Sequence, residues 1–360
     1  MKTQSQLSQS IGRFQEVFWD KRPGDRPPVG VVNPDVFLPI KYLRREPSGP
    51  VLVPADVTPD LAATDYEFGF ARPAVSCDDY LPFSAAWRAV PWLEAACDCP
   101  VRYAAGSLAP GHAVSSLSQL AETPIPARSD WLACLDRQTA GLVAAAPADC
   151  WTSPTILRGP SDVLAAMRGL SEFYCDLYDD IGLIDRTAGR VNRLLIEVLD
   201  RHFAAVPAKL GGYGHIFGYW APQRTVVIQE DVLGACSPAV YRDHFLQYNA
   251  DVVEHLGPCV HFHLHSTGYR HWRDVLAIPG LAGLQLTVEA NGPDLRALLP
   301  MMREVLERSR LILFVDHGFA DLPHVLPHLP REGLFLMVRA DHVRSEEEFC
   351  RFVAANWKRP

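Results

Sequence analysis

The chain has 360 residues, of which 48% are hydrophobic, and a formal net charge of −8 at pH 7. That length and apolar content favour one large α/β domain with a sizeable core. The acidic balance, without runs of Lys and Arg among aromatics, argues against a nucleic acid partner. No signal peptide or membrane-spanning apolar stretch is visible, so we expect a cytoplasmic protein without membrane contact. Nine cysteines, an odd number, are expected to be reduced thiols.

The first ninety residues are rich in Pro, Asp and Gly, a composition typical of irregular structure. We expect residues 1–90 to form an N-terminal segment wrapped on a barrel of residues 91–360, within a single structural domain. Hydrophobic patterns also predict strands and helices upstream of residue 230. The expected strands are 29–32, 101–105, 155–157 and 225–229, and the expected helices are 160–177 and 190–203.

The last hundred residues repeat a short apolar run, a polar or Gly/Pro break, and a helical stretch. This pattern is typical of consecutive βα units. Right-handed crossovers return each strand parallel to and beside the previous one. We therefore expect a TIM-type (β/α)8 barrel with an irregular N-terminal extension. Its last four strands are expected in CVHFHLH, GLQLTVE, LILFVDHG and GLFLMVRAD.

The strand CVHFHLH carries His261, His263 and His265 at alternate positions. Successive side chains of a strand point to opposite faces, so the three histidines share one face. The outward face of a barrel strand packs against helices and must be apolar, which places the histidines inside. His265 then lies at the C-terminal rim, where barrel enzymes carry their active sites.

The next expected strand, GLQLTVE, has its polar residues on the inward face and ends at Glu289. Two imidazoles at i and i+2, with Cα atoms roughly 6.5 to 7 Å apart, suit one metal ion. A carboxylate on the neighbouring strand is a third ligand that zinc accepts. His263, His265 and Glu289 are therefore predicted to bind a metal. Alternatively, inward polar residues line a substrate cavity without a metal.

Further stretches of the sequence stand out in chain order, namely AVPWLEAACDCPV, GPSDVLAAMRGLSEFYCDLYDD, QEDVLGACSPAVYRDHFLQYN and HFHLHSTG. Together they resemble the uroporphyrinogen decarboxylase superfamily, especially its branch of cobalamin-linked methyltransferases. The resemblance covers most of the chain from about residue 85. It implies a TIM-type barrel and a zinc ion that binds a thiol acceptor for a methyl group carried on a corrinoid.

The resemblance also implies roles for individual residues. His263 matches the first zinc ligand of that branch, and His265 stands where the second, normally a cysteine, is found. Glu289 resembles the glutamate ligand of the related cobalamin-independent methionine synthases. The distal cysteine ligand has no counterpart, but Asp341 and His342 lie near its place, which makes His342 a candidate ligand. Imidazole and carboxylate in place of thiolates leave more positive charge on zinc.

Several other residues are candidates for substrate binding or proton transfer. Asp231 resembles a recurring acidic position of the superfamily and is expected either to orient a ligand or to cap a helix. Asp316 and His317 follow the expected strand LILFV, where a general base would lie. The stretch GGYGHIFGYW contains His215, Tyr219 and Trp220. These aromatic side chains are expected to form a substrate wall or, alternatively, a packed loop.

These patterns favour a metal-dependent methyltransferase or demethylase. The methyl group would move between a small molecule or thiol and a corrinoid on a separate partner protein. Decarboxylation of the tetrapyrrole itself is not expected, because RPPVGVVNPDVF replaces the arginine-rich motif that would pair with its carboxylates. The alternatives are a decarboxylase or lyase acting on a small carboxylate, a metal-dependent hydrolase, and a binding protein without catalytic activity.

Overall fold

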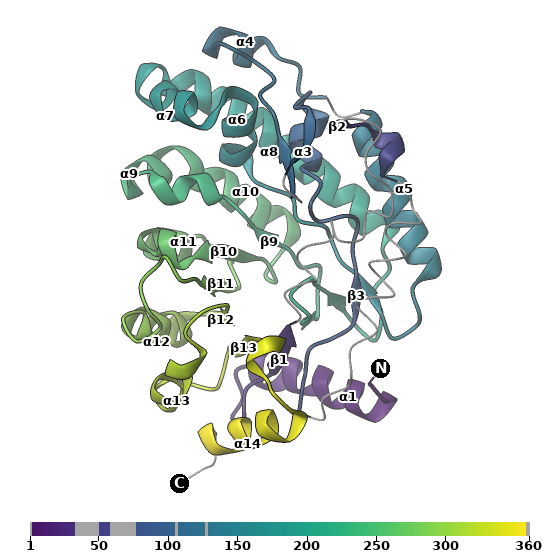
Figure 1. The fold of residues 1–360 in the computed structure, drawn as a ribbon, viewed down its shortest axis with the longest axis vertical. Helices are drawn as coiled ribbons and strands as arrows, with labels where there is room; N and C mark the ends of the chain where they lie inside the picture. The colour runs from purple at the N-terminus through teal and green to yellow at the C-terminus, as the bar shows by residue number, and fades with distance from the viewer. Residues whose placement is uncertain (1, 33–49, 58–76, 105–106, 127–128, 358–360) are drawn as a thin grey trace.

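The structure is a computed structural model and describes residues 2–32, 50–57, 77–104, 107–126 and 129–357. The stretch RPPVGVVNPDVF thus lies partly outside the described residues. The fold is a mixed α/β arrangement built around a parallel sheet (Figure 1). Within the described part of the chain, no helix combines the length and apolar character needed to cross a membrane.

Six parallel strands form the central sheet, in the order β1-β13-β12-β11-β10-β9. The four strands expected in the last hundred residues are present and adjacent, which confirms the parallel arrangement predicted for them. The N-terminal strand β1 pairs with β13, so part of the N-terminal segment belongs to the sheet itself. The strand bounds are β1 (Val29–Val32), β9 (Val227–Ile228), β10 (His261–His265), β11 (Gly283–Val288), β12 (Arg310–Val315) and β13 (Leu334–Arg339).

Helices follow these strands in chain order. Figure 1 shows α10, α11, α12 and α13 stacked one after another along the strands. On β11, Leu284, Leu286 and Val288 are at most 1% exposed and belong to the same apolar core as residues of these helices. Burial of these side chains is the main force that fixes the helices on the sheet. The helix bounds are α10 (Leu246–Leu256), α11 (Trp272–Leu276), α12 (Leu299–Arg308) and α13 (Leu322–Val325).

The middle of the chain forms a second group of helices. The single helix expected over 160–177 is divided, because Gly169 adopts a φ of 101° that a helix cannot continue through. The helix expected over 190–203 begins earlier and spans 25 residues. Its length reflects ten buried residues along one side, a pattern that packs it against α5 and α6. The bounds are α5 (Asp130–Ala145), α6 (Pro160–Arg168), α7 (Leu170–Asp179) and α8 (Ile181–Ala205).

Shorter pairings connect the middle of the chain with the ends of the sheet. Strand β3 (Phe83–Ser84) runs parallel to β6 (Trp151–Thr152), where the sequence predicted a strand a few residues later. Beyond β6, Arg158 forms a single parallel bridge with Gln229 next to β9. At the other edge, the amide of Asp79 donates to the carbonyl of Val29 in β1. These contacts link the segments that flank β3 and β6 to the two edge strands of the sheet.

The remaining elements are short or lie near the termini. Strand β4 confirms the prediction for residues 101–104, and residue 105 lies outside the described residues. Ser345 caps the last helix by accepting a hydrogen bond from the amide of Glu348. The bounds are α1 (Gln4–Arg13), α3 (Trp92–Ala96), α4 (Leu117–Glu122), α9 (Pro238–Val240), α14 (Glu346–Asn356), β2 (Val51–Leu52), β4 (Val101–Ala104), β5 (Ser107–Pro110), β7 (Tyr213–Gly214) and β8 (Trp220–Ala221).

The cysteines differ in part from the expectation of reduced thiols. Cys77 and Cys350 form a disulfide between the N-terminal part of the chain and α14. The two residues are separated by 273 positions, so no local spacing signals the pairing. The other seven cysteines are free thiols, and Cys97 and Cys99 are buried in the core. Burial raises the pKa of Cys97 to about 12, so this thiol is a packing residue at neutral pH.

A buried carboxylate fastens the N-terminal segment to the sheet. Asp79 has only 3% of its side chain exposed and pairs with Arg13, at 2.6 Å, and with Arg26. It also accepts a hydrogen bond of 3.0 Å from the amide of Val29, the first residue of β1. One carboxylate therefore joins α1, the loop before β1 and β1 itself.

Replacing Asp79 by Asn should lower the free energy of unfolding by about 3 kcal/mol, because it leaves two partly buried guanidinium groups without their counter-charge. Urea unfolding monitored by circular dichroism measures the loss. Asp243→Asn is the matched control, since Asp243 and its partner Arg242 are mostly exposed. The control should change the free energy by less than about 0.5 kcal/mol. Equal effects of the two substitutions would contradict this account of Asp79.

Candidate functional site

The register of the sheet brings the polar residues of β10 and β11 side by side. His263 lies opposite Gln285 and His265 opposite Thr287 in the parallel ladder. Because side chains alternate along a strand, these four residues and His261 point to the same face. His261 and His263 are buried, whereas the side chain of His265 is 31% exposed. The strand thus leads from a closed interior to an accessible end at His265.

Two imidazoles and one carboxylate converge at this end of the sheet. The Nε2 atoms of His263 and His265 are 3.0 Å apart. Asp231 follows β9, on the other side of β10, and its Oδ1 lies 3.5 Å from His265 Nε2 and 3.9 Å from His263 Nε2. One ligand atom from each of the three residues lies within 4.8 Å of the others. This is the spacing at which three side chains can hold one metal ion.

Neighbouring side chains determine which ring nitrogens face one another. Gln285 donates from Nε2 to Thr287 Oγ1 at 3.1 Å, which directs its Oε1 at Nδ1 of His263. Glu289 places Oε1 2.8 Å from Nδ1 of His265. An acceptor oxygen beside each Nδ1 atom favours the tautomer that carries hydrogen there. The two neutral rings then point their Nε2 lone pairs at the same place, an arrangement that repels unless a cation lies between them.

The charges around His265 favour such a cation. Burial lowers the pKa of His265, but Asp231 and Glu289 outweigh burial and raise it to about 9. Burial likewise opposes ionisation of Asp231, yet the two histidines bring its pKa down to about 2. Burial lowers the pKa of His263, which keeps this ring neutral at pH 7. Without a metal, the site therefore holds one proton on His265 next to a permanent carboxylate.

A set of buried acids behind Asp231 holds it in place. The carboxylate of Asp162, at the start of α6, accepts hydrogen bonds from the amides of Asp231 at 3.0 Å and Val232 at 2.8 Å. Next to it, Glu230 accepts from the amide of Ser161 at 2.9 Å and from Asn249 at 3.1 Å. Burial raises the pKa of Glu230 to about 7 and that of Asp162 above its ordinary value. These contacts fix the backbone from which the Asp231 side chain reaches the histidines.

Three of the four predicted metal ligands lie together in the structure, and the fourth, His342, lies elsewhere. Glu289 contacts Nδ1 of His265. Asp231 instead faces the Nε2 atoms of His263 and His265. His342 is not brought into this cluster. Its ring stacks on Phe319, with centroids 5.3 Å apart, in the turn after β13. Asp231, predicted as an orienting or capping residue, is thus the carboxylate that faces the Nε2 atoms of both histidines.

Asp316 and His317 lie at the end of β12, at the same edge of the sheet. Asp316 accepts a hydrogen bond of 2.9 Å from Arg339 at the end of β13, and Arg339 also pairs with Asp341. The amide of His317 donates to the carbonyl of Val288. The arrangement neutralises Asp316 with a guanidinium, so the structure places a charged pair, rather than an isolated base, at this point of the edge.

The aromatic stretch predicted as a substrate wall is mostly buried. His215, Tyr219 and Trp220 are each at most 5% exposed. His215 stacks on Tyr219, with ring centroids 5.1 Å apart, and Tyr219 exchanges a hydrogen bond of 2.7 Å with Thr225. Tyr219 lies 5.5 Å from His261, and Phe217 lies 6.3 Å from His263, both between ring centroids. In the described structure this stretch packs the interior beneath His263, in line with the packed-loop alternative.

Sequence reasoning missed the residues that orient the site. Gln285 shares the inward face of β11 with Thr287, and this alternation was the available signal for its contact with His263. Asp162 stands in the first turn of α6, where an acid ordinarily signals only a helix start. Nothing in the sequence indicates that it holds the amide of Asp231. Long-range packing alone supplies that contact.

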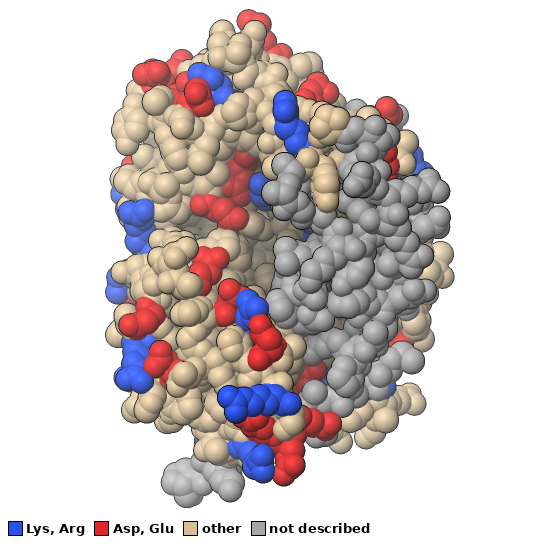
Figure 2. All heavy atoms as spheres, viewed as in Figure 1, with Lys and Arg blue, Asp and Glu red and all other residues tan. Residues whose placement is uncertain are grey.

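A cavity of about 50 Å³ adjoins the three converging residues. Asp231, His263 and His265 line it together with Tyr241 and His271. It has room for little more than one small group of a ligand. Figure 2 shows a hollow near the middle of one face of the molecule, with acidic and basic side chains near its border. The ionised Asp231 in the lining of the cavity favours a cation or an uncharged ligand over an anionic one.

Comparison with family models and with curated proteins found no match to this chain. Among solved structures, a methyltransferase from Methanosarcina mazei has a similar fold, with a TM-score of 0.62 and 13% sequence identity. The match covers 98% of this chain and 98% of that chain. At such low identity the likeness establishes the fold and leaves the activity to be argued from the site.

Glu289→Gln should lower the pKa of His265 below about 9, because the substitution removes one of the two negative charges that stabilise the imidazolium. Histidine NMR titration of protein treated with a chelator measures the change. Asp200→Asn, at a surface carboxylate beside His255, is the matched control and should leave the pKa of His265 unchanged. An unchanged or higher pKa of His265 would contradict the assignment of Glu289 as its charge partner.

Proposed function

We propose that this protein is a metal-dependent methyltransferase or demethylase. It would move a methyl group between a small molecule or thiol and a corrinoid carried by a partner protein. The observation that carries the proposal is the convergence of two imidazole nitrogens and the Asp231 carboxylate at the carboxyl ends of parallel strands. The fold shared with the methyltransferase from Methanosarcina mazei, together with the sequence resemblance, supports methyl transfer over other metal chemistry.

The residues fit a zinc ion in spacing and in protonation. Two nitrogens that bind the same zinc at 2.0 to 2.1 Å in tetrahedral geometry lie about 3.4 Å apart. The histidine nitrogens are 3.0 Å apart and the Asp231 oxygen is 3.5 Å and 3.9 Å from them. The contacts of both Nδ1 atoms leave both Nε2 lone pairs available for the ion. His263, His265 and Asp231 would be the ligands, and one coordination position would remain open.

A bound zinc ion would supply Lewis acidity, lowering the pKa of a thiol or polarising the heteroatom of a methyl donor. Glu289 would keep His265 oriented and more basic through its outer nitrogen, as carboxylates beside ligating histidines commonly do. Asp162 would hold Asp231 in place through its amide. In transfer to a thiol, the sulfur loses its proton to solvent and gains the methyl group. The cobalt of the corrinoid substrate keeps the electron pair of the broken bond.

We infer further that the fold is a closed eight-stranded barrel in a single domain. The parallel pairing of β3 with β6, the bridge from Arg158 to Gln229 beside β9, and the contact of Asp79 with β1 support this inference. Closure would place β3 and β6 as the two strands between β1 and β9. The histidines would then face the interior at the carboxyl ends of the strands, where barrel enzymes bind their substrates.

A metal-dependent hydrolase is the second candidate. Two histidines and one carboxylate with an open position are also the ligand set of several zinc hydrolases, in which the ion activates water. The nitrogen and oxygen ligands proposed here favour this alternative more than the thiolate ligands of the resembling methyltransferases would. The activity experiment below separates the two reactions.

Asp231→Asn should remove most of the bound metal, whereas Glu289→Gln should weaken the affinity only about 10- to 100-fold. The difference is expected because Asp231 faces the Nε2 atoms that would bind the metal, whereas Glu289 contacts Nδ1 of His265. Elemental analysis of untagged protein purified without chelator measures occupancy, and competition with a zinc indicator measures affinity. Wild-type protein should contain about one zinc per chain.

His255→Ala is the control for these metal measurements, since it removes a surface histidine that pairs with Asp200. It should leave occupancy unchanged. Full occupancy in the doubly substituted His263→Ala, His265→Ala protein would overturn the site. Loss of metal in Glu289→Gln with retention in Asp231→Asn would instead make Glu289 the ligand.

The zinc-loaded protein should change the spectrum of a corrinoid in one of two assays. The first contains reduced cobalamin with methyl ethers, methylamines and methyl thioethers, and the second contains methylcobalamin with thiols. Asp231→Asn should slow the reaction at least about 100-fold by removing the activating ion. No spectral change in either assay, together with hydrolysis of an ester or amide panel by the same protein, would replace methyl transfer by the second candidate.

A further inference from the structure

The two oxygens of the Asp231 carboxylate have different partners. Oδ1 lies 3.5 Å from His265 Nε2 and 3.9 Å from His263 Nε2, whereas Oδ2 accepts a hydrogen bond from Nε2 of Gln229. An ionised carboxylate can only accept hydrogen bonds, so the side-chain amide of Gln229 presents its nitrogen to Oδ2. One oxygen of Asp231 therefore faces the two histidines, and the other is engaged by Gln229.

The backbone holds Gln229 in place beside Asp231. Gln229 directly follows β9 and forms the parallel bridge with Arg158. Its carbonyl accepts a hydrogen bond of 2.7 Å from the amide of Gly159. The carboxylate of Asp162 accepts a hydrogen bond of 3.0 Å from the amide of Asp231. Asp231 is thus held at its backbone by one residue and at its side chain by another.

The number of oxygens that a carboxylate offers affects which ion a site prefers. Zinc accepts two imidazole nitrogens and one carboxylate oxygen, with a fourth position open. Manganese favours six ligands that are mostly oxygen, and a carboxylate that binds through both oxygens supplies two of them. A contact that occupies Oδ2 favours the four-coordinate ion, because it leaves Asp231 with one oxygen to offer.

We propose that Gln229 is a positioning residue that keeps Asp231 a one-oxygen ligand and thereby makes the site selective for zinc over manganese. This inference rests on the proposed metal centre and assigns a role to a residue outside its ligand set. The side chain of Asp231 is 37% exposed, so water would replace the amide at Oδ2 in its absence. An ion displaces such a water readily, whereas the backbone contacts of Gln229 keep its amide nearby.

Gln229→Met removes the amide and keeps a side chain of similar length. Zinc affinity should fall about 10- to 100-fold, as is common when the partner of a ligating residue is lost. Manganese affinity should stay the same or rise, so the ratio of the two affinities should fall at least about tenfold. Competition with a metal indicator measures both affinities in the full chain. Gln247→Met is the matched control, since Gln247 donates to the carbonyl of His244, 3.5 Å away, instead of to a proposed ligand.

Cobalt(II) in place of zinc gives a readout that a merely structural role of Gln229 would not change. Four-coordinate cobalt(II) absorbs visible light much more strongly than six-coordinate cobalt(II). Wild-type protein should show the strong absorption. Gln229→Met should lose most of it, because Asp231 then offers its second oxygen and the coordination number rises. Circular dichroism of the same samples checks that the variant is folded.

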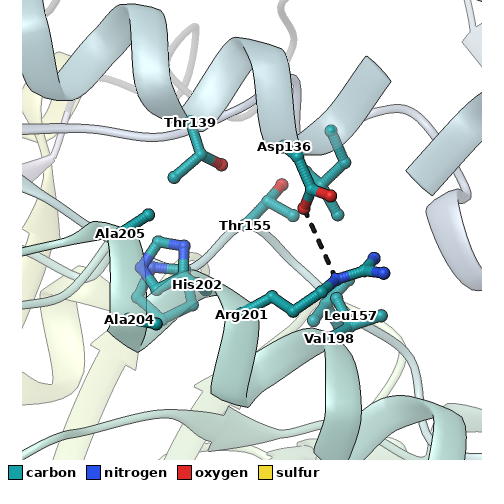
Figure 3. A pocket seen from close by; sticks show the side chains of 11 residues that line it. Asp136, Thr139, Thr155, Leu157, Val198, Arg201, His202, Ala204 and Ala205 are labelled. Carbon is teal, nitrogen blue, oxygen red and sulfur yellow. Dashed lines mark ion pairs between the residues drawn. The ribbon is translucent and has the colours of Figure 1, made fainter. Parts of the chain in front are cut away.

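A second cavity supplies a remote control. It has a volume of about 400 Å³, lies between α5 and α8, and shares no lining residue with the cavity at His263 and His265. Its lining is mostly apolar, but Asp136 Oδ1 lies 3.6 Å from Nε of Arg201, the ion pair drawn in Figure 3. Asp136→Asn should leave both metal affinities and the cobalt spectrum unchanged.

An unchanged affinity ratio and cobalt spectrum in Gln229→Met would overturn this role of Gln229 and leave the proposed metal centre in place. A six-coordinate spectrum in wild-type protein would do the same, as would equal changes in Gln247→Met or Asp136→Asn. If Gln229→Met does not fold, Gln229→Ser removes the same amide and takes its place. Wild-type protein that binds neither zinc nor cobalt would overturn the metal centre and this inference together.

Discussion

The geometry of the candidate metal site depends above all on the groups that contact the Nδ1 atoms of His263 and His265. Gln285 Oε1 lies within hydrogen-bond distance of His263 Nδ1, and Glu289 Oε1 lies 2.8 Å from His265 Nδ1. The Nε2 atoms are thereby turned toward each other at 3.0 Å, with the Asp231 carboxylate beside them. Two lone pairs and a negative charge at one point require a positive ion for stability, whether a proton or a metal. The chemistry of this edge of the sheet follows from that requirement.

The surrounding fold supports this constraint through buried polar contacts. The carboxyl ends of the parallel strands β9, β10 and β11 lie at the same edge of the sheet. Asp231 follows β9, His265 ends β10 and Glu289 follows β11, so the three residues meet at this edge. Asp162 then fixes the backbone at Asp231 from the start of α6. Apolar packing between strands and helices supplies the bulk of the stability, and these few polar contacts determine the geometry of the site.

The two cavities differ in charge and therefore in chemistry. At the edge of the sheet, a permanent carboxylate and a histidine with a raised pKa attract a cation. Between α5 and α8, Arg201 lies near Asp136 and Glu197, and burial keeps His202 neutral at pH 7. A metal ion suits the first environment, whereas the second has a mostly apolar lining. One chain thus offers two unlike binding environments on separate elements.

The sequence by itself determined the strand-and-helix order of the last hundred residues and the common face of His261, His263 and His265. Strand periodicity depends only on neighbouring residues, so it can be recognised without a fold. Tertiary structure alone decided that Asp231 approaches both Nε2 atoms, because β9 and β10 are adjacent only in the folded sheet. It likewise placed His342 against Phe319 and His202 in the lining of a cavity between α5 and α8. These contacts join residues distant in sequence, whose approach depends on how whole elements pack, and local patterns carry no information about that packing.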